Sequence, residues 1–251
     1  MFDVEMHCLI LICLIVASLG SCSELPTRFR RCARNDSGFN ECLRVAMEDA
    51  IKKLAAGDKQ LHIPALDPIY VPSATIKEGT GAVHVVQKFT DLNLHGISQS
   101  SIFKLITTHH KDTMTLIANV TSPEYVLEAN YDFDGRLLVF PIVGDGKSKI
   151  TLTNVQSDWF FVAEYQKKND QQYFTIKSFE VVLRPEKVHY EFENLFNGNK
   201  ALSDQIHGVL NENWKEVFDD VKQGYEELIA TVGKSLANQV FSKIPVNKIF
   251  L

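Results

Sequence analysis

Residues 199–241 decide the fold of this chain, and they read NKALSDQIHGVLNENWKEVFDDVKQGYEELIATVGKSLANQVF. The stretch contains no proline, and its apolar residues recur in steps of three and four, a spacing typical of an amphipathic α-helix. We therefore predict one continuous helix, about 60 Å long at 1.5 Å per residue. Gly208, Gly224 and Gly233 weaken such a helix, so we expect them where another part of the chain comes close. The apolar face of so long a helix needs a cover along its whole length.

Residues 83–196 supply that cover as β-strands, because their hydrophobic residues alternate with a period of two. The alternation is clearest at residues 125–133. Asp134-Gly135 then predicts a tight hairpin, with residues 136–143 as the returning strand, and Gly144-Asp145-Gly146 predicts another turn. Short connections imply an antiparallel sheet of consecutive neighbours, and further strands are expected at residues 83–95, 101–109, 113–120, 149–154, 159–166 and 173–184.

A second amphipathic helix is predicted at residues 39–56, with an apolar face made of Cys42, Leu43, Ala46, Ala50 and Leu54. Ser37 is its candidate N-cap and Gly57 its end. Prolines at positions 64, 68 and 72 then favour an extended segment. Together these elements predict an α+β fold, in which an antiparallel sheet wraps a long C-terminal helix as an elongated roll.

The N-terminus has the pattern of a secretory signal peptide. Residues 8–19, CLILICLIVASL, have the length of its apolar segment and are too short to span a bilayer. Small residues follow, so we expect cleavage after Ser23, with residues 1–23 removed and residues 24–251 forming a single domain. The basic residue usual near the start is missing, and an uncleaved N-terminal anchor is the alternative. A cleaved peptide predicts an extracellular protein with no stable membrane insertion.

Cysteine usage fits export. Three of the five cysteines fall in the segment to be removed, which leaves Cys32 and Cys42 as a pair suited to one disulfide in an oxidising compartment. The sequons at Asn35 and Asn119 become candidate glycosylation sites on the same route.

Several function classes are disfavoured. A net charge of −5 and the absence of a lysine- and arginine-rich block argue against a nucleic-acid partner. The sequence has no nucleophile elbow, zincin motif, phosphate-binding loop or dinucleotide fingerprint, so we expect neither an enzyme nor a cofactor. His109 and His110 are adjacent in a predicted strand, where they point to opposite faces, so we expect no metal site.

Three blocks carry a resemblance to a known family. They are CARNDSGFNEC (32–42) followed by LHIPALDPIYVP (61–72), then YDFDGRLLVFPIVGDGKSKITL (131–152), and FENLFNGNKALSDQIHGVLNENWKEVF (192–218). Over essentially its whole mature length the chain resembles the takeout / juvenile-hormone-binding family of secreted insect proteins. It has no cysteine after Cys42 for the second disulfide of the hormone-binding members. The resemblance is therefore to the takeout branch, and juvenile hormone stays open as the ligand.

The resemblance implies a super-roll of the tubular lipid-binding type with a hydrophobic tunnel. It further implies a monomeric secreted carrier of a terpenoid or fatty-acid-like ligand, linked to feeding, circadian timing or mating. Tyr131 and Trp214 are the candidates for orienting one end of the ligand. The tunnel-wall candidates, chosen by their period, are Leu116, Leu127, Ala129, Phe179, Val181, Leu183, Leu210 and Phe218.

Two alternatives stay open. The hydrophobic period of the helices and strands is the same whether the core is filled with side chains or encloses a cavity, so the sequence pattern does not distinguish the two. The other function considered is a secreted membrane- or partner-binding protein whose apolar surface is external and which has no ligand tunnel.

Overall fold

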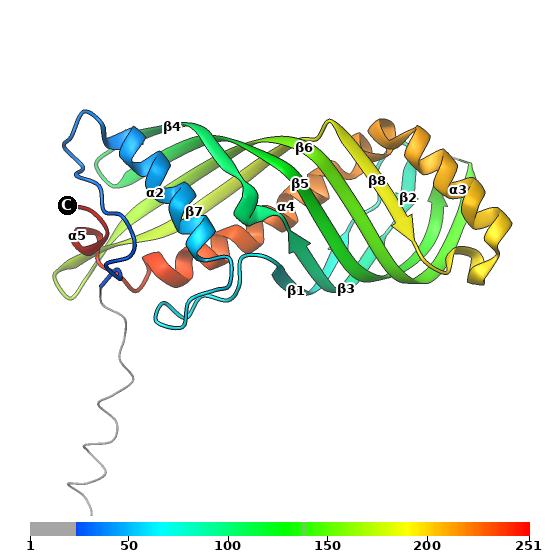
Figure 1. The fold of residues 1–251 in the computed structure, drawn as a ribbon, viewed down its shortest axis with the longest axis horizontal. Helices are drawn as coiled ribbons and strands as arrows, with labels where there is room; N and C mark the ends of the chain where they lie inside the picture. Colours follow the sequence, from blue (N-terminus) through cyan, green and yellow to red (C-terminus); the bar gives the residue numbers. More distant parts are fainter. Residues whose placement is uncertain (1–23, 138) are drawn as a thin grey trace, which may run out of the picture.

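A curved eight-stranded antiparallel sheet wraps around the C-terminal helix α4 (Figure 1). The computed structural model describes residues 24–137 and 139–251, and the predicted signal peptide lies outside these described residues. The strand order is β1-β3-β5-β6-β7, with β2 and β4 paired to β5 and β8 paired to β6. The strands are β1 (Ile69–Ile76), β2 (Val83–Val85), β3 (Gln87–His95), β4 (Ser101–His109), β5 (Thr113–Leu137), β6 (Phe140–Lys168), β7 (Gln171–Arg184) and β8 (Lys187–Phe192).

The C-terminal helical region is broken, which corrects the prediction of one continuous helix. Helix α3 (Lys200–Glu212) ends at Asn213, and α4 (Trp214–Phe241) then runs for 28 residues, about 42 Å. The Asn213 side-chain amide donates to the Val209 carbonyl oxygen at 2.8 Å, so it competes locally for the helix backbone. Helix α3 lies at one end of the roll and α4 passes along its interior (Figure 1).

Strands β5 and β6 form one long hairpin, in which Leu137 pairs with Phe140. The predicted hairpin at Asp134-Gly135 is therefore wrong, because these residues pair with Val143 and Ile142 inside the ladder. The predicted turn at residues 144–146 is wrong for the same reason, since it lies within β6. The expected strands at 113–120 and 125–133 are likewise parts of one strand.

Close approach of other chain segments explains these strand glycines. A Cβ atom added at Gly135 would lie 2.3 Å from the His84 carbonyl oxygen, and one at Gly146 would lie 2.7 Å from that of Glu193. Any side chain at either position would displace the neighbouring backbone, which at Gly135 belongs to the paired strand β2. Glycine at these two positions therefore allows other backbone segments to come close to the hairpin, and does not form the turns that the sequence pattern predicted.

The N-terminal helix α2 (Phe39–Lys53) starts where predicted but has a different cap. Its N-cap is Gly38, whose N–H donates to the Asp36 carboxylate at 2.7 Å, so the prediction of Ser37 as N-cap is wrong. The helix ends three residues earlier than predicted, and Gly57 follows it with a φ of 78°. The remaining short helices are η2 (Ile97–Gln99), η3 (Leu195–Gly198) and α5 (Val246–Ile249).

Side chains of α4 bind the free edge of β7, which has no strand beyond it in the described sheet. The Leu183 N–H donates to the Glu226 carboxylate at 2.8 Å, and the Ile176 N–H donates to the Asn238 side chain at 2.8 Å. Burial raises the pKa of Glu226, and the bond from Leu183 opposes that shift. The helix thereby covers an edge that would otherwise expose unpaired backbone groups.

Two α4 glycines make the close contacts that the sequence predicts. A Cβ atom at Gly224 would lie 2.6 Å from the Ile76 side chain, and one at Gly233 would lie 2.3 Å from the Phe179 ring. Gly208, in α3, has open space around it. Glycine therefore allows α4 to lie directly against β1 and β7.

Candidate ligand-binding cavity

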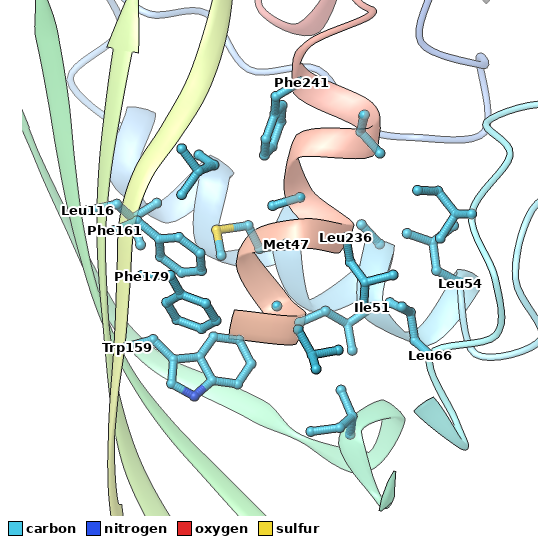
Figure 2. A pocket seen from close by; sticks show the side chains of 18 of the residues that line it. Met47, Ile51, Leu54, Leu66, Leu116, Trp159, Phe161, Phe179, Leu236 and Phe241 are labelled. Carbon is cyan, nitrogen blue, oxygen red and sulfur yellow. The ribbon is translucent and has the colours of Figure 1, made fainter. Parts of the chain in front are cut away.

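One half of the roll is hollow. A cavity of about 340 Å³ lies between α2, the second half of α4 and the inner face of the sheet (Figure 2). That volume falls at the lower end of the range for small-molecule pockets. Its lining is almost wholly aliphatic and aromatic, and Arg30 is the only lining residue in the described chain with a charged side chain. A lining of this composition favours an apolar occupant over water, because it offers water few hydrogen-bond partners.

The sheet side of the cavity carries an aromatic wall made of Trp159, Phe161 and Phe179 (Figure 2). The Phe161 and Phe179 rings stack with centroids 4.0 Å apart, and the Trp159 ring meets Phe179 edge-on at 6.1 Å. Phe161 is paired with Phe179 across β6 and β7, so the register of these strands sets the stack. Gly233 leaves room for the Phe179 ring against α4.

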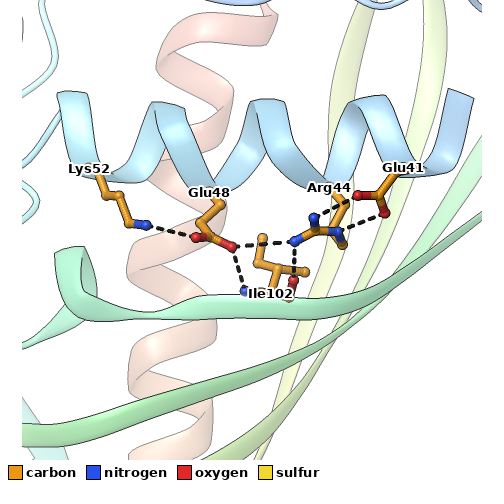
Figure 3. A network of polar contacts seen from close by, with 5 residues as sticks. All are labelled: Glu41, Arg44, Glu48, Lys52 and Ile102. Atoms are coloured by element: carbon orange, nitrogen blue, oxygen red, sulfur yellow. Dashed lines mark hydrogen bonds and ion pairs between the residues drawn. The ribbon is translucent and has the colours of Figure 1, made fainter.

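Helix α2 closes the opposite side and is held by polar bonds to the outer edge of β4 (Figure 3). The Arg44 guanidinium donates to the Ile102 carbonyl oxygen at 2.7 Å, and the Ile102 N–H donates to the Glu48 carboxylate at 3.1 Å. Nearer the start of the helix, the Thr107 N–H and hydroxyl both donate to the Asn40 side-chain oxygen, at 3.1 and 2.7 Å. These bonds hold α2 so that its apolar face, including Met47 and Ile51, lines the cavity.

The charges on α2 stay on the outside of the roll. Glu41 binds Arg44 through both carboxylate oxygens, at 2.8 and 2.7 Å, and Lys52 donates to Glu48 at 2.7 Å. The bond from Lys52 holds the pKa of Glu48 below its usual range, and the bond to Glu41 raises the pKa of Arg44. The Glu48 pKa is lower in the folded protein than in the unfolded chain, so the ionised carboxylate stabilises the fold fully at pH values above the ordinary glutamate pKa. This stabilisation is lost as the pH falls through the lowered pKa of the folded protein.

Comparison with known proteins decides the family. The sequence matches the family model "Haemolymph juvenile hormone binding protein (JHBP)" over residues 8–251. The chain belongs to the JHBP family. Its relatives include the circadian clock-controlled protein daywake of Drosophila melanogaster, 28% identical over 95% of this chain and 91% of that protein. The daywake of Drosophila yakuba is 26% identical over 90% of this chain and 88% of that protein.

A solved structure confirms the fold of this JHBP family member. Epiphyas postvittana Takeout 1 superposes with a TM-score of 0.77 at 22% identity, covering 88% of this chain and 98% of that one. The predicted α+β roll, a sheet curved around a long C-terminal helix, is therefore confirmed. So is the resemblance to the takeout / juvenile-hormone-binding family.

The sequence analysis selected ten ligand-binding candidates, and three of them line the cavity: Leu116, Leu127 and Phe179. Ala129 lies instead at a separate open hollow of about 800 Å³ with a mixed polar lining, beside α3 and β8. Trp214 is half-buried at the start of α4. Four further candidates are buried in the packed core outside the cavity: Val181, Leu183, Leu210 and Phe218.

Tyr131 also lies outside the cavity, in an aromatic cluster at the η3 end of the hairpin. Its ring centroid is 4.6 Å from that of Phe133 and 5.2 Å from that of Phe192. Its hydroxyl donates to the Glu193 carbonyl oxygen at 2.5 Å, and burial raises its pKa to about 12. The hydroxyl is thus used within the fold.

Sequence reasoning missed two parts of the lining. One is the inner face of α2, and the other is the second half of α4, with Leu228, Val232 and Leu236. Both were recognised as apolar faces, but the wall residues were chosen from the first half of the C-terminal helical region. The available signal was the sequence Trp159-Phe160-Phe161, because alternation in a strand puts the Trp159 and Phe161 rings on the same face.

No group of three or more His, Cys, Asp or Glu side chains in residues 24–137 and 139–251 is arranged to hold a metal ion. Within the same residues, no helix combines the length and the apolar character needed to cross a membrane.

Cys32 and Cys42 are joined by a disulfide, as the cysteine count predicts. The bond links the N-terminal segment to α2, and residues of both line the cavity.

Glycosylation is expected at Asn35 in preference to Asn119. Asn35 is exposed in a turn, whereas the Asn119 side-chain nitrogen, the atom that would carry a glycan, donates to Asp158 at 2.6 Å. A glycan on Asn119 would cost that bond. Glycopeptide mapping of the secreted protein should show the higher occupancy at Asn35, and full occupancy of Asn119 with a bare Asn35 would reverse the ranking.

Proposed function

We propose that this protein is a secreted, non-catalytic carrier of an elongated lipophilic molecule. The cavity is the observation that carries the proposal, because its lining offers apolar contact on every side and a single charged group. A ligand that moves from water into such a cavity gains about 25 cal/mol for each Å² of apolar surface removed from water. Membership of the JHBP family supports the same function, since the family is one of carriers of lipophilic ligands.

The proposed ligand is terpenoid or fatty-acid-like, carried by a monomer in haemolymph or a similar extracellular fluid. Support for the compartment comes from the disulfide and from the family description, which names haemolymph. Support for a link to circadian timing comes from the Drosophila relatives, both described as circadian clock-controlled. Links to feeding and mating rest on the sequence resemblance to takeout proteins.

A secreted membrane- or partner-binding protein is the competing function. Its support is a group of exposed apolar side chains on the outer faces of β4 and β5, where Ile106 and Ile117 are 42% and 41% exposed and Phe103 is 63% exposed. Ile106 and Ile117 pair across the two strands.

One experiment separates the two functions. The natively secreted protein is purified without detergent, and one portion is extracted with organic solvent for mass spectrometry. A second portion is mixed with liposomes and sedimented. A carrier should release a stoichiometric lipid and stay in the supernatant. A protein that yields no lipid and sediments with the liposomes would contradict the carrier function and favour the external surface.

A further inference from the structure

Four arginines lie close together in the segment that leads into the cavity end of the fold, and three of them are used by the fold. Arg28 pairs with Asp58. Arg31 donates to the carbonyl oxygens of Asn247 and Phe250, at 2.9 and 2.6 Å. Arg34 donates to the Tyr165 hydroxyl at 2.8 Å. Each therefore contributes to attaching the N-terminal segment.

Arg30 differs from these neighbours. It is exposed, it lines the cavity, and the described part of the chain provides no hydrogen bond or ion pair for its guanidinium. The described lining of the cavity includes no aspartate or glutamate that would repel an anion. Arginine remains protonated at all physiological pH values, so the one charged side chain of the described lining is a cation.

The position of Arg30 is at the end of the roll where the two terminal segments meet. The Leu251 N–H donates to the Cys32 carbonyl oxygen at 2.9 Å, which joins the segments. Leu25, Phe29 and Phe250 line the cavity at this end. From here the apolar lining continues along α4 to Leu228 and to Trp159 on the sheet. Arg30 therefore belongs to one end of the cavity, and the rest of the described lining carries no charged side chain.

We propose that the Arg30 guanidinium binds the carboxylate of an elongated ligand whose hydrocarbon chain occupies the cavity. This inference rests on the proposed carrier function and narrows its ligand class to fatty-acid-like anions, in preference to neutral esters or alcohols of the same length. A planar guanidinium matches a carboxylate with two parallel hydrogen bonds, whereas an ester has no negative charge to offer. Because Arg30 is exposed, water screens the pair, and a preference of about tenfold is expected.

The test compares two probes of equal chain length, laurate and methyl laurate, on delipidated full-length mature protein at neutral pH. Wild-type protein should bind laurate about tenfold more tightly than the ester. Arg30→Gln should lower laurate affinity to that of the ester and leave ester affinity unchanged, and Arg30→Lys should restore part of the preference. Arg136→Gln is the matched control, because Arg136 is an exposed arginine outside the cavity lining.

The possible failures are distinguishable. If wild-type protein binds both probes but Arg30→Gln leaves laurate affinity unchanged, or lowers affinity for both probes equally, the carboxylate pairing is wrong and the carrier function stands. If wild-type protein binds neither probe, the carboxylate pairing is wrong, and the carrier function is decided by the solvent-extraction and liposome experiment. An equal loss of laurate affinity in Arg136→Gln would also overturn the proposal, because it would show a general charge effect.

Discussion

Replacing Leu236 with tryptophan is expected to lower affinity for an apolar ligand by roughly ten- to a hundredfold while leaving the fold intact. Leu236 projects from α4 into the cavity (Figure 2), so an indole there takes space that a ligand would occupy. The ligand then loses the contact equivalent of about one large apolar side chain, worth about 1.5–3 kcal/mol. Because an apolar void accepts the ring without displacing the core, we expect the free energy of unfolding to change by less than about 1 kcal/mol.

The matched control is Leu210→Trp, the same change at a helical position in the packed part of the core. Leu210 is 4% exposed and lies outside the cavity lining. Overpacking there should lower the free energy of unfolding by about 1–3 kcal/mol and leave ligand affinity unchanged in the folded protein. Equilibrium lipid binding and urea unfolding, measured on both variants, give the comparison. Equal destabilisation with unchanged binding in both would show that the cavity is not where the ligand lies.

Replacing Cys32 and Cys42 together with serine is expected to lower the free energy of unfolding by about 2–3 kcal/mol. The disulfide closes a loop over a sequence separation of 10 residues, so the estimate is that of a short loop in the chain-entropy description. For a domain of this size the corresponding fall in Tm is about 5–10 °C. Lipid affinity should fall as well, because the bond holds the N-terminal segment against α2 at the cavity.

Thermal unfolding followed by circular dichroism measures this effect, with reductant-treated wild-type protein as the control. Reduction should reproduce the lower Tm of the double variant and should leave the double variant itself unchanged. Two alkylatable thiols in secreted wild-type protein that has not been reduced would contradict the pairing. An unchanged Tm in the double variant would show that the fold holds both segments without the bond.

Local sequence patterns correctly predicted those helices and strands that bury one face and expose the other. The period of two at residues 101–109 gave a strand with the bounds of β4 (Ser101–His109). The steps of three and four gave the helices of the C-terminal region, and the cysteine count gave the disulfide. These features could be predicted because each is set by burial of one side of a segment, or by residues of the segment itself.

The position of the β5–β6 turn depended on contacts between segments that are distant in the sequence. Gly135 and Gly146 have the sequence character of hairpin residues, yet each pairs within the β5–β6 ladder and has the backbone of another segment in close contact. The break at Asn213 separates two helical runs whose apolar spacing continues across it. The apolar spacing therefore does not mark the break at Asn213, and a local pattern does not contain the position of the distant segments beside Gly135 and Gly146.

What the sequence by itself determined is the fold class, the curved sheet around a C-terminal helix, and the family. Only the tertiary structure decided which half of the roll is hollow. Leu210 and Leu236 both belong to the apolar face predicted for the C-terminal helical region. Core side chains surround Leu210, whereas Leu236 borders the cavity. Hydrophobic periodicity indicates which face of a helix or strand is buried away from water. Whether that face meets protein atoms or empty space depends on the summed volumes of side chains from α2, α4 and five strands, which only the assembled fold brings together.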